Sequence, residues 1–128
     1  MWDMFKGCKN LGNLNISNFD TSQVTDMQSM FNGCSSLVSL DLSHFVTSKV
    51  QYMNKMFKDC IKLESLNFNQ ITSESLGTMH QMFYNCSSLK YLNIFTLIED
   101  IQSINEILQG TPNNFKLFGV PYNISAID

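Results

Sequence analysis

Arginine is absent from this 128-residue sequence, and all eight of its basic residues are lysines. Eleven acidic residues outnumber them, which leaves a formal net charge of -3. A nucleic-acid-binding domain needs a clustered positive surface, usually one that contains arginine. The composition therefore argues against a nucleic-acid partner.

Long hydrophobic runs are also missing. No stretch approaches the roughly 20 apolar residues of a membrane-spanning helix, and no basic-then-apolar export signal follows Met1. Charged residues make up only 15% of the chain, whereas apolar residues reach 44%, which is unlike a disordered protein. We therefore expect one folded domain with a polar, weakly charged surface and no membrane span.

Closely spaced cysteine pairs, which structural zinc sites require, do not occur. Each cysteine is followed by the next after 26 residues: Cys8, Cys34, Cys60 and Cys86. We expect buried, small apolar side chains that stack in parallel rather than form disulfides, although the sequence leaves their redox state open. The sequence also lacks a phosphate-binding glycine loop and any recognisable Ser-His-Asp arrangement. We expect no enzyme, no metal site and no cofactor.

The same 26-residue step organises the apolar residues. Met-Phe pairs and two leucine columns recur at this interval, and all eight methionines fall in two columns. The columns are Met1, Met27, Met53 and Met79; Met4, Met30, Met56 and Met82; Leu11, Leu37, Leu63 and Leu89; and Leu14, Leu40, Leu66 and Leu92. A fixed period of this length is typical of proteins built from stacked repeats.

The residue pattern within each repeat predicts one strand and one short helix. Apolar and polar residues alternate around Leu40, as in a half-buried strand. Apolar residues at i, i+3, i+6 and i+7 from Val50 to Phe57 indicate one face of a two-turn helix. The residue before each cysteine is of a type that tolerates a positive φ, so we expect a left-handed position that ends the helix. These residues are Gly7, Gly33, Asp59 and Asn85.

A strand and a two-turn helix cannot form a core alone, so the repeats must stack on one another. Leu37, Leu40 and Leu42 match the strand signature of leucine-rich repeats, and the segment from Met30 to Val50 resembles the 26-residue repeats of BspA-like leucine-rich repeat surface proteins. The expected fold is an α/β leucine-rich repeat solenoid, with a parallel concave sheet and one short helix per repeat on the convex side.

The resemblance covers about residues 1–110, which we expect to form about four repeats, the first truncated. Near its end the pattern needs a one-residue deletion, after which Gly110 matches Gly33 and Thr111 replaces the cysteine. Residues 111–128 contain both prolines and several apolar residues. We expect them to form a C-terminal cap over the open end of the stack.

One polar column is expected to point outward from successive strands, flanked by serines and aromatic residues. It can be a solvated sheet face or a partner-binding surface, and both interpretations stay open. The candidate residues are Asn15, Asp41, Asn67, Asn93, Ser39, Ser65, Tyr91 and Phe95. His44 and His80 occupy unrelated repeat positions and are expected to be exposed.

The resemblance implies a non-enzymatic adhesion module that binds a protein of a host or neighbouring cell. It also implies an extracellular or cell-surface location. The alternatives are a structural spacer and an intracellular protein-interaction scaffold, neither of which would need a specific site in this segment.

Overall fold

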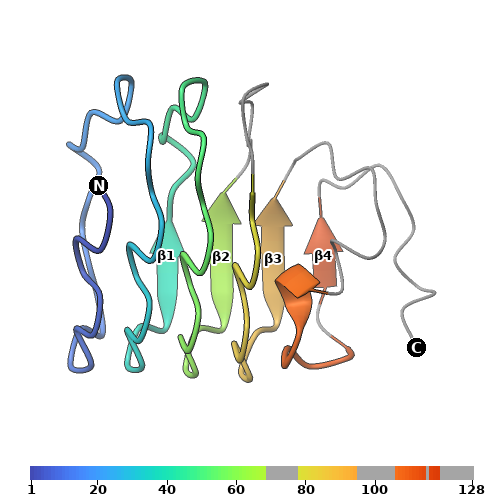
Figure 1. Cartoon of the computed structure of the whole chain (residues 1–128). Coiled ribbons are helices and arrows are strands. Elements are labelled where there is room, and N and C mark those ends of the chain that lie inside the picture. The colour runs from blue at the N-terminus through green and yellow to red at the C-terminus, as the bar shows by residue number, and fades with distance from the viewer. Residues whose placement is uncertain (69–77, 95–105, 115, 119–128) are drawn as a thin grey trace.

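A small parallel sheet organises the chain. The computed structural model describes residues 1–68, 78–94, 106–114 and 116–118. Turns and irregular backbone make up most of these residues, with one helical turn at residues 106–108. Within them, four short strands lie side by side in chain order (Figure 1): β1 (Ser39–Asp41), β2 (Ser65–Phe68), β3 (Tyr91–Ile94) and β4 (Lys116–Phe118).

The strand register follows the sequence repeat. Leu40 pairs with Leu66, Leu66 with Leu92, and Leu92 with Leu117, all in parallel. Successive partners are therefore 26, 26 and 25 residues apart, and the shorter last step agrees with the one-residue deletion near residue 101. Residues 116–118, expected within a cap, thus continue the sheet as β4.

Equivalent apolar residues form continuous columns through the core. Phe5, Phe31, Phe57 and Phe83 stack with ring centroids 5.5, 5.4 and 5.4 Å apart and with nearly parallel rings. The last three are fully buried, as are the methionines that directly precede them, Met30, Met56 and Met82. Burial of each large apolar side chain contributes about 1.5–3 kcal/mol, and here neighbouring repeats provide much of that burial.

The helix predicted from Val50 to Phe57 is wrong. In the described residues, backbone N–H groups at alternate positions donate to carbonyls of the following repeat instead of to carbonyls four residues earlier. The Phe31 N–H donates to the Met56 oxygen at 2.9 Å, and the Phe57 N–H donates to the Met82 oxygen at 2.9 Å. The segment is a series of turns whose backbone N–H groups bond to carbonyls of the next repeat. The repeats therefore need no helix to satisfy these groups.

Backbone dihedrals show the physical reason for the difference. Ser29, Lys55 and Gln81 have φ values of 52°, 57° and 54°. A right-handed helix excludes such values because every residue in it has negative φ. The apolar spacing that resembled a helix face also fits turns closed by i to i+3 bonds, such as the bond from the Cys34 N–H to the Phe31 oxygen.

The predicted left-handed position before each cysteine is confirmed, although it ends a turn rather than a helix. Gly7, Gly33, Asp59 and Asn85 have φ values of 74°, 75°, 59° and 61°. Glycine adopts this conformation freely, and asparagine and aspartate tolerate it better than other residues do.

Replacing Gly33 with valine should therefore destabilise the fold by roughly 1 kcal/mol or more, because a β-branched side chain resists positive φ. An added Cβ would lie 3.6 Å from the nearest atom, so backbone strain and not crowding causes the loss. Chemical denaturation measures the effect. Gly12→Ala is the matched control, because Gly12 lacks a positive φ and its added Cβ would have an ordinary 3.8 Å contact. Equal stability of the two variants would contradict the assignment.

Candidate functional site

Six of the eight candidate residues lie together on the sheet face. They line one open depression of about 420 Å³ that crosses β1, β2 and β3. Leu40 and Leu66 complete its lining. The parallel register creates this arrangement, because it sets equivalent outward residues of each repeat beside one another. The six are Ser39, Asp41, Ser65, Asn67, Tyr91 and Asn93.

Side-chain hydrogen bonds run across the depression from strand to strand. The Asn93 Nδ2 donates to Asn67 Oδ1 at 3.0 Å, and the Asn67 Nδ2 donates to Asp41 Oδ1 at 3.3 Å. Asp41 Oδ1 also accepts the Ser43 backbone N–H at 2.9 Å. This last bond is the main reason that the pKa of the exposed Asp41 carboxyl lies below its ordinary value. The row therefore ends at β1 in a carboxylate, which carries the negative charge of the face.

Tyr91 provides the aromatic part of the depression. Its side chain is 49% exposed at the start of β3, although Leu92 beside it is buried. Tyrosine combines a large apolar surface with a hydroxyl group, which makes it common in protein interfaces. The surface thus combines a carboxylate, amides and hydroxyls with one exposed ring.

The other two candidates do not contribute to this depression as described. Asn15 is exposed but belongs to no strand, and its Oδ1 accepts the Ser17 backbone N–H at 3.1 Å. The first repeat contributes no strand to the described sheet, so Asn15 does not lie on one of the four strands and its role as a binding residue stays a prediction. Phe95 lies outside the described residues.

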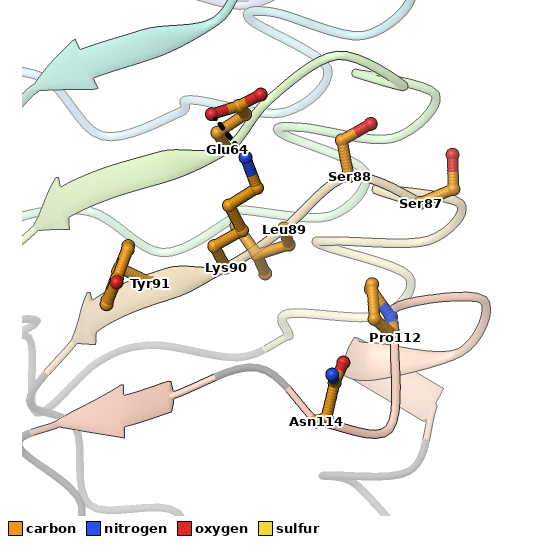
Figure 2. A pocket seen from close by; sticks show the side chains of 8 residues that line it. All are labelled: Glu64, Ser87, Ser88, Leu89, Lys90, Tyr91, Pro112 and Asn114. Carbon is orange, nitrogen blue, oxygen red and sulfur yellow. Dashed lines mark ion pairs between the residues drawn. The ribbon is translucent and has the colours of Figure 1, made fainter.

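A second hollow, also of about 420 Å³, adjoins the first through Tyr91 (Figure 2). Lys90 Nζ lies 2.8 Å from Glu64 Oε2 at this site, and both side chains are about half exposed. Pro112 and Asn114 come from the loop that precedes β4 (Figure 2). The lining residues are Glu64, Ser87, Ser88, Leu89, Lys90, Tyr91, Pro112 and Asn114.

Sequence reasoning missed this second hollow. Its only signal is the loss of the repeat pattern after Gly110, where Thr111 and Asn114 replace the usual cysteine and leucine. We interpreted that loss as the start of a cap. The loss of the repeat pattern also changes the shape of the surface beside Tyr91.

Comparison with protein families gives one match, to the family described as Mycoplasma protein of unknown function, DUF285, over residues 1–112. The chain belongs to the DUF285 family. The match includes every repeat but brings no activity with it. No curated protein and no solved structure matches the chain.

The cysteines of this DUF285 chain form a second ordered row. Cys34, Cys60 and Cys86 are buried free thiols, as predicted, but the same expectation is wrong for Cys8, which is exposed in the first repeat. Each buried thiol donates to the carbonyl of a phenylalanine in the preceding repeat at 3.1 Å. The acceptors are Phe5, Phe31 and Phe57 in that order.

Burial makes these thiols unreactive. Desolvation raises the pKa of Cys34 to about 11 and that of Cys86 to about 12, and it raises the pKa of Cys60 as well. The thiols therefore stay protonated at neutral pH and are poor nucleophiles and metal ligands. Across the described part of the chain, no cluster of three or more His, Cys, Asp or Glu residues could hold a metal ion.

The two histidines are exposed and make separate contacts. His44 Nε2 lies 2.9 Å from the Ile16 carbonyl oxygen, and His80 Nδ1 lies 3.0 Å from Glu106 Oε2. They belong to different repeats and share no site. None of the helices in the described ranges has the length and apolar character needed to span a membrane.

The raised thiol pKa values predict a loss of stability at alkaline pH. The Cys86 thiol has an ordinary pKa of 9.0 and a folded value of about 12. Below pH 9 the Cys86 thiol is protonated in both the folded and the unfolded protein, so its full contribution to the free energy of unfolding is present there. Above pH 9 the unfolded state loses its proton first, and the free energy of unfolding falls as the pH rises towards 12.

Between pH 8 and 10, the parent should lose about 1 kcal/mol more stability than Cys86→Ala. Denaturant unfolding under reducing conditions at the two pH values measures this difference. Cys8→Ala is the control, and it should show the pH dependence of the parent because Cys8 is exposed. An identical alkaline loss in the parent and Cys86→Ala would show that the buried thiol is not responsible.

Proposed function

We propose that this DUF285 chain is a non-enzymatic protein-binding and adhesion module of a secreted or cell-surface leucine-rich repeat protein. Its partner is a protein of a host or neighbouring cell, bound through the outward face of the sheet. One observation carries the proposal: six side chains chosen from the sequence as a binding surface line one continuous depression.

In this proposal the repeats form a leucine-rich repeat solenoid of the BspA-like type. Three features support it: parallel strands offset by the repeat length, the stack of phenylalanine rings, and the backbone bonds between repeats. The side opposite the sheet consists mostly of turns, with one helical turn at residues 106–108. The polar sheet face is the surface on which a solenoid commonly binds its partner.

The shape of the surface favours a macromolecule over a small ligand. Small-molecule sites are deep and enclose most of the ligand, whereas this depression is open along its length. A stable protein interface buries about 800 Å² on each partner, which requires more than one depression. Tyr91 joins the two hollows, and the Lys90–Glu64 ion pair lines the second of them.

The alternative is a structural spacer or an intracellular scaffold with no specific site in this segment. The row of bonds from Asn93 through Asn67 to Asp41 favours it, because these side chains already satisfy one another. A solvated face with no partner would look the same. Binding measurements separate the two functions.

Substitutions on the sheet face should reduce adhesion. We expect beads that carry the parent chain to attach to cultured epithelial cells, and beads that carry Asp41→Lys or Tyr91→Ala to attach with an affinity lower by about tenfold or more. Losses of this size are usual when a central tyrosine or charged residue of an interface is replaced. Flow cytometry of fluorescent beads over a range of chain densities measures the affinity.

Gln51→Lys is the matched control, because Gln51 is exposed and belongs to no strand. It introduces a lysine, as Asp41→Lys does, and should bind like the parent. Circular dichroism must show that every variant is folded. Equal attachment of the parent, the sheet-face variants and the control would eliminate the sheet face as the binding surface and favour the spacer.

A further inference from the structure

The sequence contains a single Asn-Gly pair, formed by Asn32 and Gly33 in the second repeat. Asparagine deamidates most readily before glycine, because glycine has no side chain to hinder attack by its own backbone nitrogen. Gly33 has a φ of 75°, a conformation that glycine adopts freely. The residue that suits this turn therefore also creates a chemically reactive pair.

Deamidation is a reaction within the chain that needs only water. The backbone nitrogen of Gly33 loses its proton and bonds to the side-chain carbonyl carbon of Asn32, the bond from that carbon to Nδ2 breaks, and ammonia leaves with the proton. The product is a cyclic succinimide. Water then opens the ring at either carbonyl, which gives aspartate or isoaspartate. The reaction can start only when the Gly33 nitrogen is free to turn towards the Asn32 side chain.

The peptide group that joins Asn32 to Gly33 is hydrogen-bonded to both neighbouring repeats. Its N–H, which belongs to Gly33, donates to the Lys58 oxygen at 2.8 Å in the following repeat. Its carbonyl, which belongs to Asn32, accepts the Gly7 N–H at 2.7 Å from the preceding repeat. Rotation of this group towards the Asn32 side chain would break both hydrogen bonds. The stacking of the repeats thus holds the attacking nitrogen away from its target.

We propose that Asn32 is a deamidation site that the hydrogen bonds between repeats protect in the folded chain. The reaction then proceeds only during local opening of the second repeat, and its rate reports how often that opening occurs. Asn32 is only partly buried, so water reaches its side chain. The restrained backbone, and not exclusion of water, therefore provides the protection.

The two products differ in their effect on the stack. In isoaspartate the backbone runs through Cβ, which places an extra atom between residues 32 and 33. The altered peptide group cannot then meet both Gly7 and Lys58, so this product should be less stable than the parent. Aspartate keeps the normal backbone and adds a carboxylate in the repeat column between Lys6 and Lys58. Asn32→Asp is therefore the reference that separates the backbone effect from the new charge.

A comparison of two sites within one molecule tests the proposal. Asn114→Gly places a second Asn-Gly pair at Asn113, in an exposed turn where the residue 114 N–H donates to no carbonyl of the described residues. In mildly alkaline buffer, Asn32 should deamidate about tenfold or more slowly than Asn113, because only its open fraction reacts. In concentrated urea the two rates should become similar. Peptide mapping by mass spectrometry follows both sites in the same sample.

Phe57→Leu, added to Asn114→Gly, provides a second test. The Phe57 ring stacks on Phe31 at 5.4 Å, so its loss weakens the contact between the second and third repeats. Deamidation at Asn32 should become several-fold faster while the rate at Asn113 stays unchanged, and circular dichroism checks that the variant is folded. Equal rates at the two sites in the folded chain would overturn the proposal, and so would a Phe57→Leu variant in which Asn32 reacts no faster.

Discussion

The hydrogen bonds that join each repeat to the next, on the side away from the sheet, determine the rest of this structure. Phe31 donates to Met56, and Phe57 donates to Met82, at the same distance of 2.9 Å. These bonds fix the axial position of every repeat, and the ring stack, the thiol row and the strand register follow from it. Left-handed residues such as Ser29 and Lys55 make them possible, because they turn alternate N–H groups towards the neighbouring repeat.

Residue columns explain what could be predicted from the sequence. The leucine period predicted the pairing of Leu40 with Leu66, and the Gly, Asp and Asn column predicted positive φ at Gly33. The helix was wrong because turns closed by i to i+3 bonds produce the same apolar spacing. The second left-handed column could not be found, because Lys55 and Gln81 have no intrinsic preference for that conformation. Nothing in the sequence indicated that the first repeat would contribute no strand at Asn15.

The candidate site depends on the same stacking. Because each repeat is placed alike, Asp41, Asn67 and Asn93 come within hydrogen-bonding reach and cover the sheet with a regular polar face. The regularity ends near Tyr91, where the second hollow lies beside residues that no longer follow the 26-residue repeat, such as Pro112 and Asn114. Function in such a protein would therefore arise from the places where repeats differ, while identical positions maintain the stack.

Removal of one period tests the central claim most directly. Deletion of residues 27–52 joins Asp26 to Met53 and keeps every column in phase, whereas deletion of residues 40–52 joins Ser39 to Met53 and breaks them. The stacking account predicts that the 26-residue deletion folds cooperatively with reduced stability, because one set of contacts between repeats is lost, and that the 13-residue deletion loses cooperative unfolding. Denaturant unfolding monitored by circular dichroism distinguishes them. Equal behaviour of the two deletions would contradict the account.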